Sequence, residues 1–184
     1  MSTSPELQST LTLLHDPRNW RKACQTIVKL GDRNALIPLI KAYEQRWEGS
    51  RQPLLKAMSA LNAAATAPNL FDEASNPEIQ RLAVHLMEIF PSEQALPRLA
   101  LAARSVEPAL RAQAGRSMVC QPQTPAWEQE MISLLKSPDE CLRGWVIEGL
   151  SLCDRASARQ ALLSHLLEET NPILHDKLAA LDLQ

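Results

Sequence analysis

The sequence predicts an all-α protein, and three features of its 184 residues support that prediction. The chain is rich in leucine and alanine and has only five glycines, and such a composition favours helices because these side chains lose little conformational freedom in them. Valine and isoleucine are sparse, and no alternation of apolar and polar residues marks a strand. Polar or proline-containing breaks recur roughly every 13 to 20 residues, which divides the chain into about twelve short segments.

Half of these breaks have the composition of helix N-termini. A short polar or acidic residue, usually followed by proline, precedes an apolar-periodic segment in "HDPRN", "EGSRQP", "SNPEI", "VEPAL", "KSPDE" and "TNPIL". Residues of this kind cap helices, and proline is tolerated at the first helical position because it leaves no N–H unsatisfied. The remaining breaks, "LGDRN", "TAPN", "FPSEQ", "CQPQTP" and "LCDRAS", divide the chain between these starts.

The segments group into six helix pairs. The predicted pairs are 5–14 with 17–30, 34–47 with 51–65, 68–74 with 77–90, 93–104 with 107–119, 125–135 with 139–152, and 155–168 with 172–182. Apolar residues recur at helical spacing in each second helix, as Ala23, Ile27 and Leu30 do in the first pair. One such pair cannot bury its own apolar face, so we expect the pairs to stack into a single domain over residues 1–184, a curved solenoid with an inner and an outer helix layer.

Residues 16–40, "DPRNWRKACQTIVKLGDRNALIPLI", resemble a HEAT repeat of the short kind first named from phycobilisome lyases. The matching residues are Asp16, Pro17, Arg21, Ala23, Leu30, Gly31, Asp32, Ala35, Ile37 and Pro38. The pattern recurs more loosely at 76–99 and 137–163, while the middle pairs are degenerate. The resemblance implies a right-handed α-solenoid of about six HEAT-like pairs, a fold that serves adaptors, chaperones and a few enzymes.

Charge and hydropathy restrict the partners and the location. The formal net charge of −2 argues against a dedicated duplex-DNA binder, because neutralisation of phosphates supplies most of the affinity of such proteins. No apolar run approaches the ~20 residues of a membrane span. The first residues, "MSTSPELQST", lack a signal-peptide pattern. We therefore expect a cytoplasmic protein with no membrane partner, and the charge balance disfavours a nucleic acid as its partner without excluding a local basic stripe.

No catalytic or metal-binding pattern is present in the sequence. The four cysteines, Cys24, Cys120, Cys141 and Cys153, form no C-x-x-C pair, and their apolar neighbours predict buried free thiols. The two His–Asp dipeptides, at 15–16 and 175–176, are expected at opposite ends of the array, too far apart for one metal ion. Glu168 and Glu169 are adjacent and diverge by about 100° on a helix, so we interpret them as a solvated helix end. The sequence thus predicts no enzyme activity, metal or cofactor.

Tryptophans and glycines are interpreted as packing residues. Trp47 and Trp127 are expected on outer helices and Trp20 and Trp145 on inner ones, packing in the core or between repeats with their indole N–H groups bonded to carbonyls. Gly115, Gly144 and Gly149 fall inside inner helices, where close approach of two helices would offset glycine's cost of ~1 kcal/mol relative to alanine.

In HEAT arrays the second helix of each pair lines the concave side, so the resemblance implies a binding surface there. The predicted protein-binding residues are Arg21, Lys22, Gln25, Lys56, Arg81, His85, Glu88, Arg111, Arg143, Trp145 and Glu148. A wall of mixed charge suits a protein partner, which predicts a non-catalytic interaction scaffold, adaptor or client-specific chaperone. Two alternatives stay open: a bilin-lyase-like subunit that acts on a chromophore-bearing protein, and a HEAT-like nucleic-acid binder that uses tryptophans and acids.

Arginines recur at a spacing of thirty residues, at Arg21, Arg51, Arg81 and Arg111, and Arg143 follows thirty-two residues later. When the helices are aligned by their small and leucine positions, Arg21 and Arg81 are equivalent, and Arg111 and Arg143 lie one position earlier. Arg51 falls outside this series. The arginines are therefore expected to mark the repeat first and a binding surface second, and some should pair with acids of the adjacent repeat, each exposed pair adding less than ~1 kcal/mol.

Overall fold

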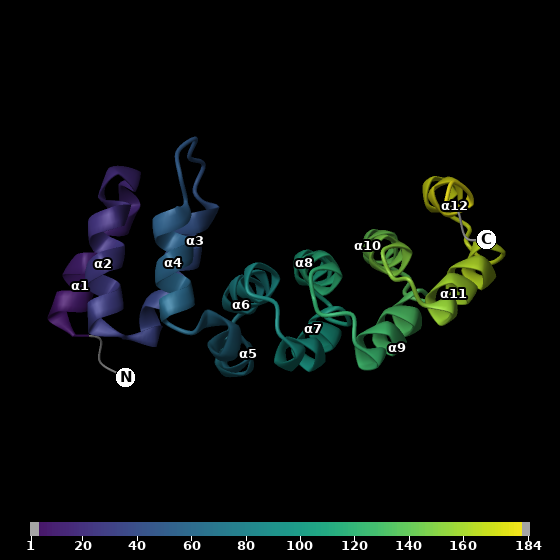
Figure 1. Cartoon of the computed structure of the whole chain (residues 1–184), viewed down its shortest axis with the longest axis horizontal. Coiled ribbons are helices and arrows are strands. Elements are labelled where there is room, and N and C mark those ends of the chain that lie inside the picture. The colour runs from purple at the N-terminus through teal and green to yellow at the C-terminus, as the bar shows by residue number, and fades with distance from the viewer. Residues whose placement is uncertain (1–3, 182–184) are drawn as a thin grey trace. The chain divides into compact units, whose positions relative to one another are not determined.

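The computed structural model describes residues 4–181, and every regular element in that range is helical (Figure 1). The α-helices are α1 (Pro5–Thr12), α2 (Trp20–Leu30), α3 (Leu36–Glu44), α4 (Gln52–Ala60), α5 (Ala63–Glu73), α6 (Pro77–Ile89), α7 (Leu96–Ala102), α8 (Pro108–Val119), α9 (Pro125–Leu134), α10 (Glu140–Ser151), α11 (Ala156–Leu166) and α12 (Pro172–Ala179). Two 3-10 turns, Leu13–His15 and Pro17–Asn19, lie between α1 and α2, and single 3-10 turns, Arg33–Ala35 and Glu93–Ala95, lead into α3 and α7. The all-α prediction is confirmed, and no helix within 4–181 is long and apolar enough to cross a membrane.

Side-chain caps begin many of these helices where the sequence predicts them. Asn76, Thr124 and Asp139 accept hydrogen bonds from the N–H groups three residues later, at the starts of α6, α9 and α10. Asn171 does the same at α12. Each such bond satisfies an N–H that the helix itself leaves without a partner.

The predicted boundary at "TAPN" is wrong. Helix α5 continues through Pro68, and the chain turns earlier, at Asn62, which has φ 57° in the left-handed region that asparagine tolerates. A proline inside a helix costs ~3 kcal/mol. Here Ala63, Ala67, Pro68 and Phe71 are all buried on one side of α5, so packing of the pyrrolidine ring offsets that cost.

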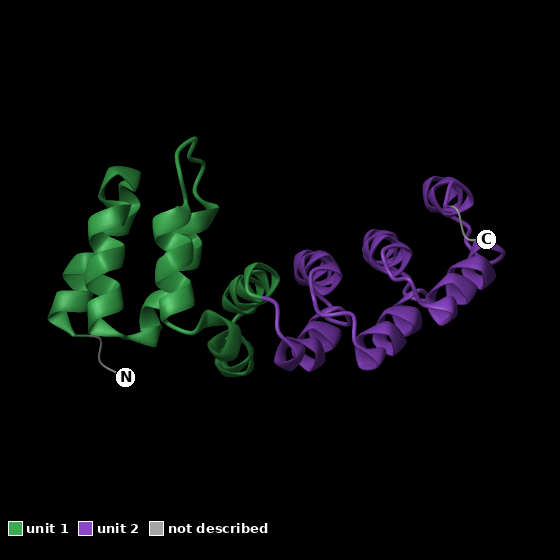
Figure 2. Cartoon of the chain, in the orientation of Figure 1, with its two compact units in different colours: residues 1–90 green, residues 91–184 purple. Residues whose placement is uncertain are grey.

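The helices form two compact units, residues 1–90 and residues 91–184 (Figure 2). In unit 1, α2 packs on α1 and α4, α3 packs on α4 and α6, and α5 packs on α6. In unit 2, α7, α9 and α11 form one layer and α8, α10 and α12 form another (Figure 1). Helices therefore pack against near neighbours in the sequence, and the expectation of one domain stays a prediction.

Tryptophans anchor the core of each unit, as expected. Trp20 is 1% exposed and donates its indole N–H to the Leu14 carbonyl at 2.9 Å; Trp127 is 0% exposed and donates to the Met118 carbonyl at 2.7 Å. Trp47 differs from the prediction, because it lies beyond the end of α3. Its ring meets that of Trp20 edge-on, with 6.2 Å between centroids.

Close helix approach explains one of the glycines, Gly115. A Cβ built on Gly115 of α8 would lie 2.8 Å from Leu142 Cδ1 and 3.2 Å from Trp145 Cβ, both on α10. A Cβ on Gly149 would overlap only Met131 Cε, the movable end of a flexible side chain. A Cβ on Gly144 would meet only Leu174 Cδ2, at an ordinary 3.4 Å, so this glycine is not required by packing.

Candidate functional site

The predicted binding residues fall into two groups. Those of α2 and α4 are exposed: Arg21, Lys22, Gln25 and Lys56. Those of α6, α8 and α10 are half-buried: Arg81, His85, Glu88, Arg111, Arg143, Trp145 and Glu148. The two groups also differ in their partners within the chain.

In unit 1 the charged residues of α6 are held by α3. Arg81 donates through Nη1 and Nη2 to the two carboxylate oxygens of Glu44, at 2.7 and 2.9 Å, and His85 Nδ1 lies 2.7 Å from Glu44 Oε1. These hydrogen bonds, that of Arg81 foremost, lower the pKa of Glu44 below its usual value. The Tyr43 ring packs edge-on against His85. Arg81 and His85 thus join α3 to α6, and Glu88 also has a partner within the chain.

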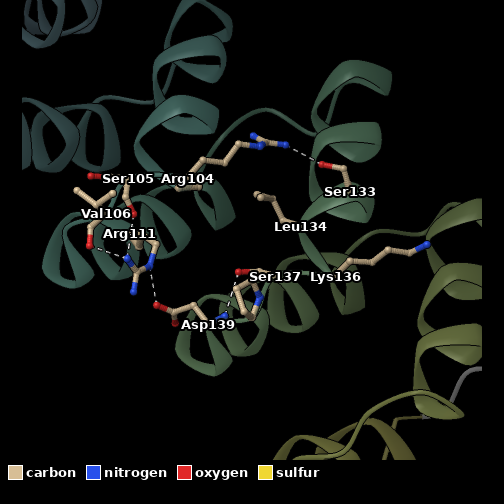
Figure 3. A pocket seen from close by; sticks show the side chains of 11 residues that line it. Arg104, Ser105, Val106, Arg111, Ser133, Leu134, Lys136, Ser137 and Asp139 are labelled. Carbon is tan, nitrogen blue, oxygen red and sulfur yellow. Dashed lines mark hydrogen bonds and ion pairs between the residues drawn. The ribbon is translucent and has the colours of Figure 1, made fainter.

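In unit 2, Arg111 lines a pocket of about 590 Å³ between the turns that precede α8 and α10 (Figure 3). Its Nη1 donates to the Ser105 carbonyl at 2.9 Å, and its Nε donates to Asp139 Oδ2 at 2.7 Å. Across the pocket, Arg104 donates to Ser133 Oγ at 3.0 Å (Figure 3). Arg111 therefore joins the two turns, and Arg104 joins the turn after α7 to α9.

Arg143 repeats this arrangement one helix pair later. Its Nη1 donates to the Ser137 carbonyl at 2.9 Å, and its Nε and Nη2 donate to the two oxygens of Glu169 at 2.9 and 2.8 Å. Glu169 also contacts His165 Nε2 at 3.0 Å and accepts from the Asn171 N–H at 2.8 Å. Its side chain is only 1% exposed, so the expected solvated helix end is wrong for Glu169. The turn after α11 folds this carboxylate beneath Arg143, which lowers its pKa to about 2.

The recurrent arginines are thus mostly structural. Arg111 and Arg143 are the fourth residues of α8 and α10, and each bonds a carbonyl six residues earlier, in agreement with their predicted equivalence. Arg51 makes the same kind of contact, since its Nη2 donates to the Gln45 carbonyl at 2.9 Å. The sequence alignment placed Arg51 outside the series because it precedes its helix instead of lying within it.

Trp145 and Glu148 are also engaged within unit 2. Trp145 packs against Gly115, and Glu148 pairs with Lys177 of α12 at 2.6 Å. All the predicted binding residues of α6, α8 and α10 therefore contact other residues within their own unit or chain.

We use the name α2–α4 face for five exposed residues on α2 and α4: Arg21, Lys22, Gln25, Lys29 and Lys56. Helices α2 and α4 pack against each other, and neither contains an acidic residue. In the described range, none of these five exposed side chains has a hydrogen bond or ion pair with another residue. Its four cations are uncompensated within the fold.

The cysteines and the side chains that could bind a metal are the remaining candidates for chemistry among residues 4–181. No group of three or more His, Cys, Asp or Glu side chains there could hold a metal ion. Cys24 and Cys153 are buried as predicted, whereas Cys120 and Cys141 are exposed, because they lie at helix ends on the solvent side. Burial raises the pKa of the Cys24 thiol to about 11, which keeps it protonated and unreactive at neutral pH.

Comparison with known proteins bears on the fold alone. No protein-family model and no curated protein matches the sequence. Among solved structures, the chain is similar to an engineered protein whose crystal structure comes from the Northeast Structural Genomics Consortium. The match covers 98% of this chain and 96% of that one, with a TM-score of 0.53 and 14% sequence identity. Similarity at this identity supports a related helical arrangement and carries no functional information.

Proposed function

We propose that this chain is a right-handed, HEAT-like α-solenoid that acts in the cytoplasm as a non-catalytic protein-interaction scaffold, adaptor or client-specific chaperone. Two features support the fold: the two-layered helix pairs of unit 2, and the turn-bracing arginines that recur in equivalent positions. Solenoids of this kind are stabilised by contacts that recur between each helix pair and the next.

The α2–α4 face is the observation that carries the binding role. Most arginines and lysines outside it bond to acids or carbonyls within their own unit, as Arg81, Arg111 and Arg143 do. Arg21, Lys22 and Lys56 do not contribute to the fold in this way, although they lie on two helices that are firmly packed. Charges held on a rigid surface and left without a partner are suited to recognition, since complementary charge sets specificity and association rate.

Affinity capture tests the binding role. The tagged full chain is used as bait in extracts of its source cell, with and without nuclease, and bound proteins are quantified against a tag-only bait. We expect at least one protein enriched in every replicate and insensitive to nuclease. The proposal fails if no protein is enriched reproducibly, if capture depends on nucleic acid, or if the chain and its captured partner together transfer a visible chromophore.

A further inference from the structure

We propose that the α2–α4 face binds an acidic segment of a protein partner, whose carboxylates pair with Arg21, Lys22, Lys29 and Lys56. This inference rests on the protein-binding function proposed above and specifies the chemistry of the partner.

The charge distribution of unit 1 points to this face. Lys41 pairs with Glu78 at 2.9 Å, and Arg81 pairs with Glu44 at 2.7 Å. Arg51 is held by backbone carbonyls. Within residues 4–181 the cations of the α2–α4 face have no such partners. Arg33 and Arg46 are likewise exposed and unpaired there but lie outside the α-helices, whereas these four cations lie on two packed helices that carry no acidic residue.

The spacing of the residues suits a segment laid along the helices. Arg21, Gln25 and Val28 lie at positions i, i+4 and i+7 of α2, which places them along one side of the helix. Val28 is 41% exposed and offers an apolar contact beside the cations. An acidic helix or extended strand with one apolar side chain would match this arrangement, and the Arg21 guanidinium can bind a carboxylate through two hydrogen bonds.

A nucleic acid fits the same face less well. Single-stranded nucleic acids bind largely by stacking bases on aromatic side chains. Neither helix exposes one, since Trp20 of α2 is 1% exposed, and the 38% exposed Trp47 lies beyond α3 with its ring packed edge-on against Trp20. Duplex binding relies on many phosphate contacts, and the net charge of −2 works against these. Carboxylates of a protein segment need only the few cations that are present.

Peptide binding to the full-length chain tests the inference. The probes are a short Glu-rich peptide, the same peptide with Gln in place of Glu, and a short DNA duplex, followed by amide chemical shifts and by titration. We expect the Glu-rich peptide to shift α2 and α4 resonances and to bind at least about tenfold more tightly than the Gln version. Affinity should fall as the salt concentration rises, because screening weakens exposed charge pairs.

Charge-matched variants locate the site. The test variant carries Arg21→Glu, Lys22→Glu and Lys56→Glu. The control carries Arg33→Glu, Arg46→Glu and Arg159→Glu, which changes the net charge equally at exposed residues outside the face. We expect the test variant to lose at least about tenfold in affinity for the Glu-rich peptide and the control to retain most of it.

Some outcomes overturn the acidic-segment inference alone. They are equal losses in both variants, equal binding of the Gln peptide, or tighter binding of the duplex through the same residues. The binding function survives these if the partner captured from cells is retained by the test variant. Arg21→Gln with Lys56→Gln replaces the triple variant if circular dichroism shows that the triple variant is unfolded.

Discussion

The carboxylate of Glu169 illustrates how single residues hold the helix pairs together. It lies at the turn after α11, with Arg143 of α10 on one side and the Asn171 N–H on the other. At 1% exposure it depends on these partners for the solvation that it loses on folding. The ionised form is favoured in the folded state, which is why its pKa falls from 4.5 to about 2.

The substitution Glu169→Gln should destabilise the protein in a pH-dependent manner. A carboxyl whose pKa is lowered by folding stabilises the protein fully above its unfolded value, and this contribution is lost as pH falls from 4.5 towards about 2. At neutral pH we expect a loss of about 3 kcal/mol in the free energy of unfolding. Urea denaturation at pH 7 and pH 3 measures it. The difference between variant and native protein should shrink by more than half at pH 3, and an unchanged difference would count against the Arg143 contact as its origin.

At the scale of helices, glycines show where backbones must approach. Gly115 faces Leu142 and Trp145 on the neighbouring α10, and one of the contacting atoms is the Trp145 Cβ, which cannot move without its backbone. Gly144, on α10 itself, has room for a methyl group. Substitution of Gly115 therefore tests the packing role of glycine, whereas substitution of Gly144 tests only its low helix propensity.

We expect opposite effects of alanine at these two sites. Gly144→Ala should stabilise the protein by up to ~1 kcal/mol, since alanine favours the helix and meets no obstruction. Gly115→Ala gains the same propensity but forces α8 and α10 apart, at a cost of ~1–3 kcal/mol. Thermal unfolding of both variants decides the matter. A rise in melting temperature for Gly115→Ala would show that α8 and α10 do not approach as described.

Asn62 sets the boundary between α4 and α5 through its left-handed backbone. Asn62→Ala should lose ~1–2 kcal/mol, because a Cβ without a hydrogen-bonding group is disfavoured at that φ. Asn62→Gly should remain close to the native stability, since glycine adopts positive φ without strain. Chemical denaturation measures the free energy of unfolding of the two variants. Equal losses in both would show that the left-handed backbone at Asn62 is not the cause.

The boundaries of α4 and α5 also show what the sequence could and could not predict. Caps such as Asn76 and Asp139 act locally, so the helix starts that they define are visible in the sequence. The sequence predicts a break at Pro68, because the burial that lets this proline stay within α5 is not a local property. Ion pairs between distant residues are equally hard to predict. Glu169 lies 26 residues from Arg143, and no sequence pattern indicates that the two side chains meet.

At the scale of the whole chain, the choice of a candidate surface depends on contacts that the sequence pattern does not contain. The repeat pattern led to a set of polar residues on the second helices, but it did not show which of them the fold already uses. Arg81, Arg111 and Arg143 resemble Arg21 in the sequence, yet each of the three has a bonded partner within residues 4–181 and Arg21 has none there. What distinguishes them is whether a neighbouring helix pair supplies an acid opposite, and this requires the three-dimensional packing.

Cross-linking of the captured complex tests the central claim most directly. The chain has six lysines: Lys22, Lys29 and Lys56 on the α2–α4 face, and Lys41, Lys136 and Lys177 elsewhere. If a partner occupies this face, an amine-reactive linker should join it mainly to Lys22, Lys29 and Lys56. Cross-links to the partner that are concentrated at Lys136 and Lys177, with none at Lys22, Lys29 or Lys56, would contradict binding through the α2–α4 face.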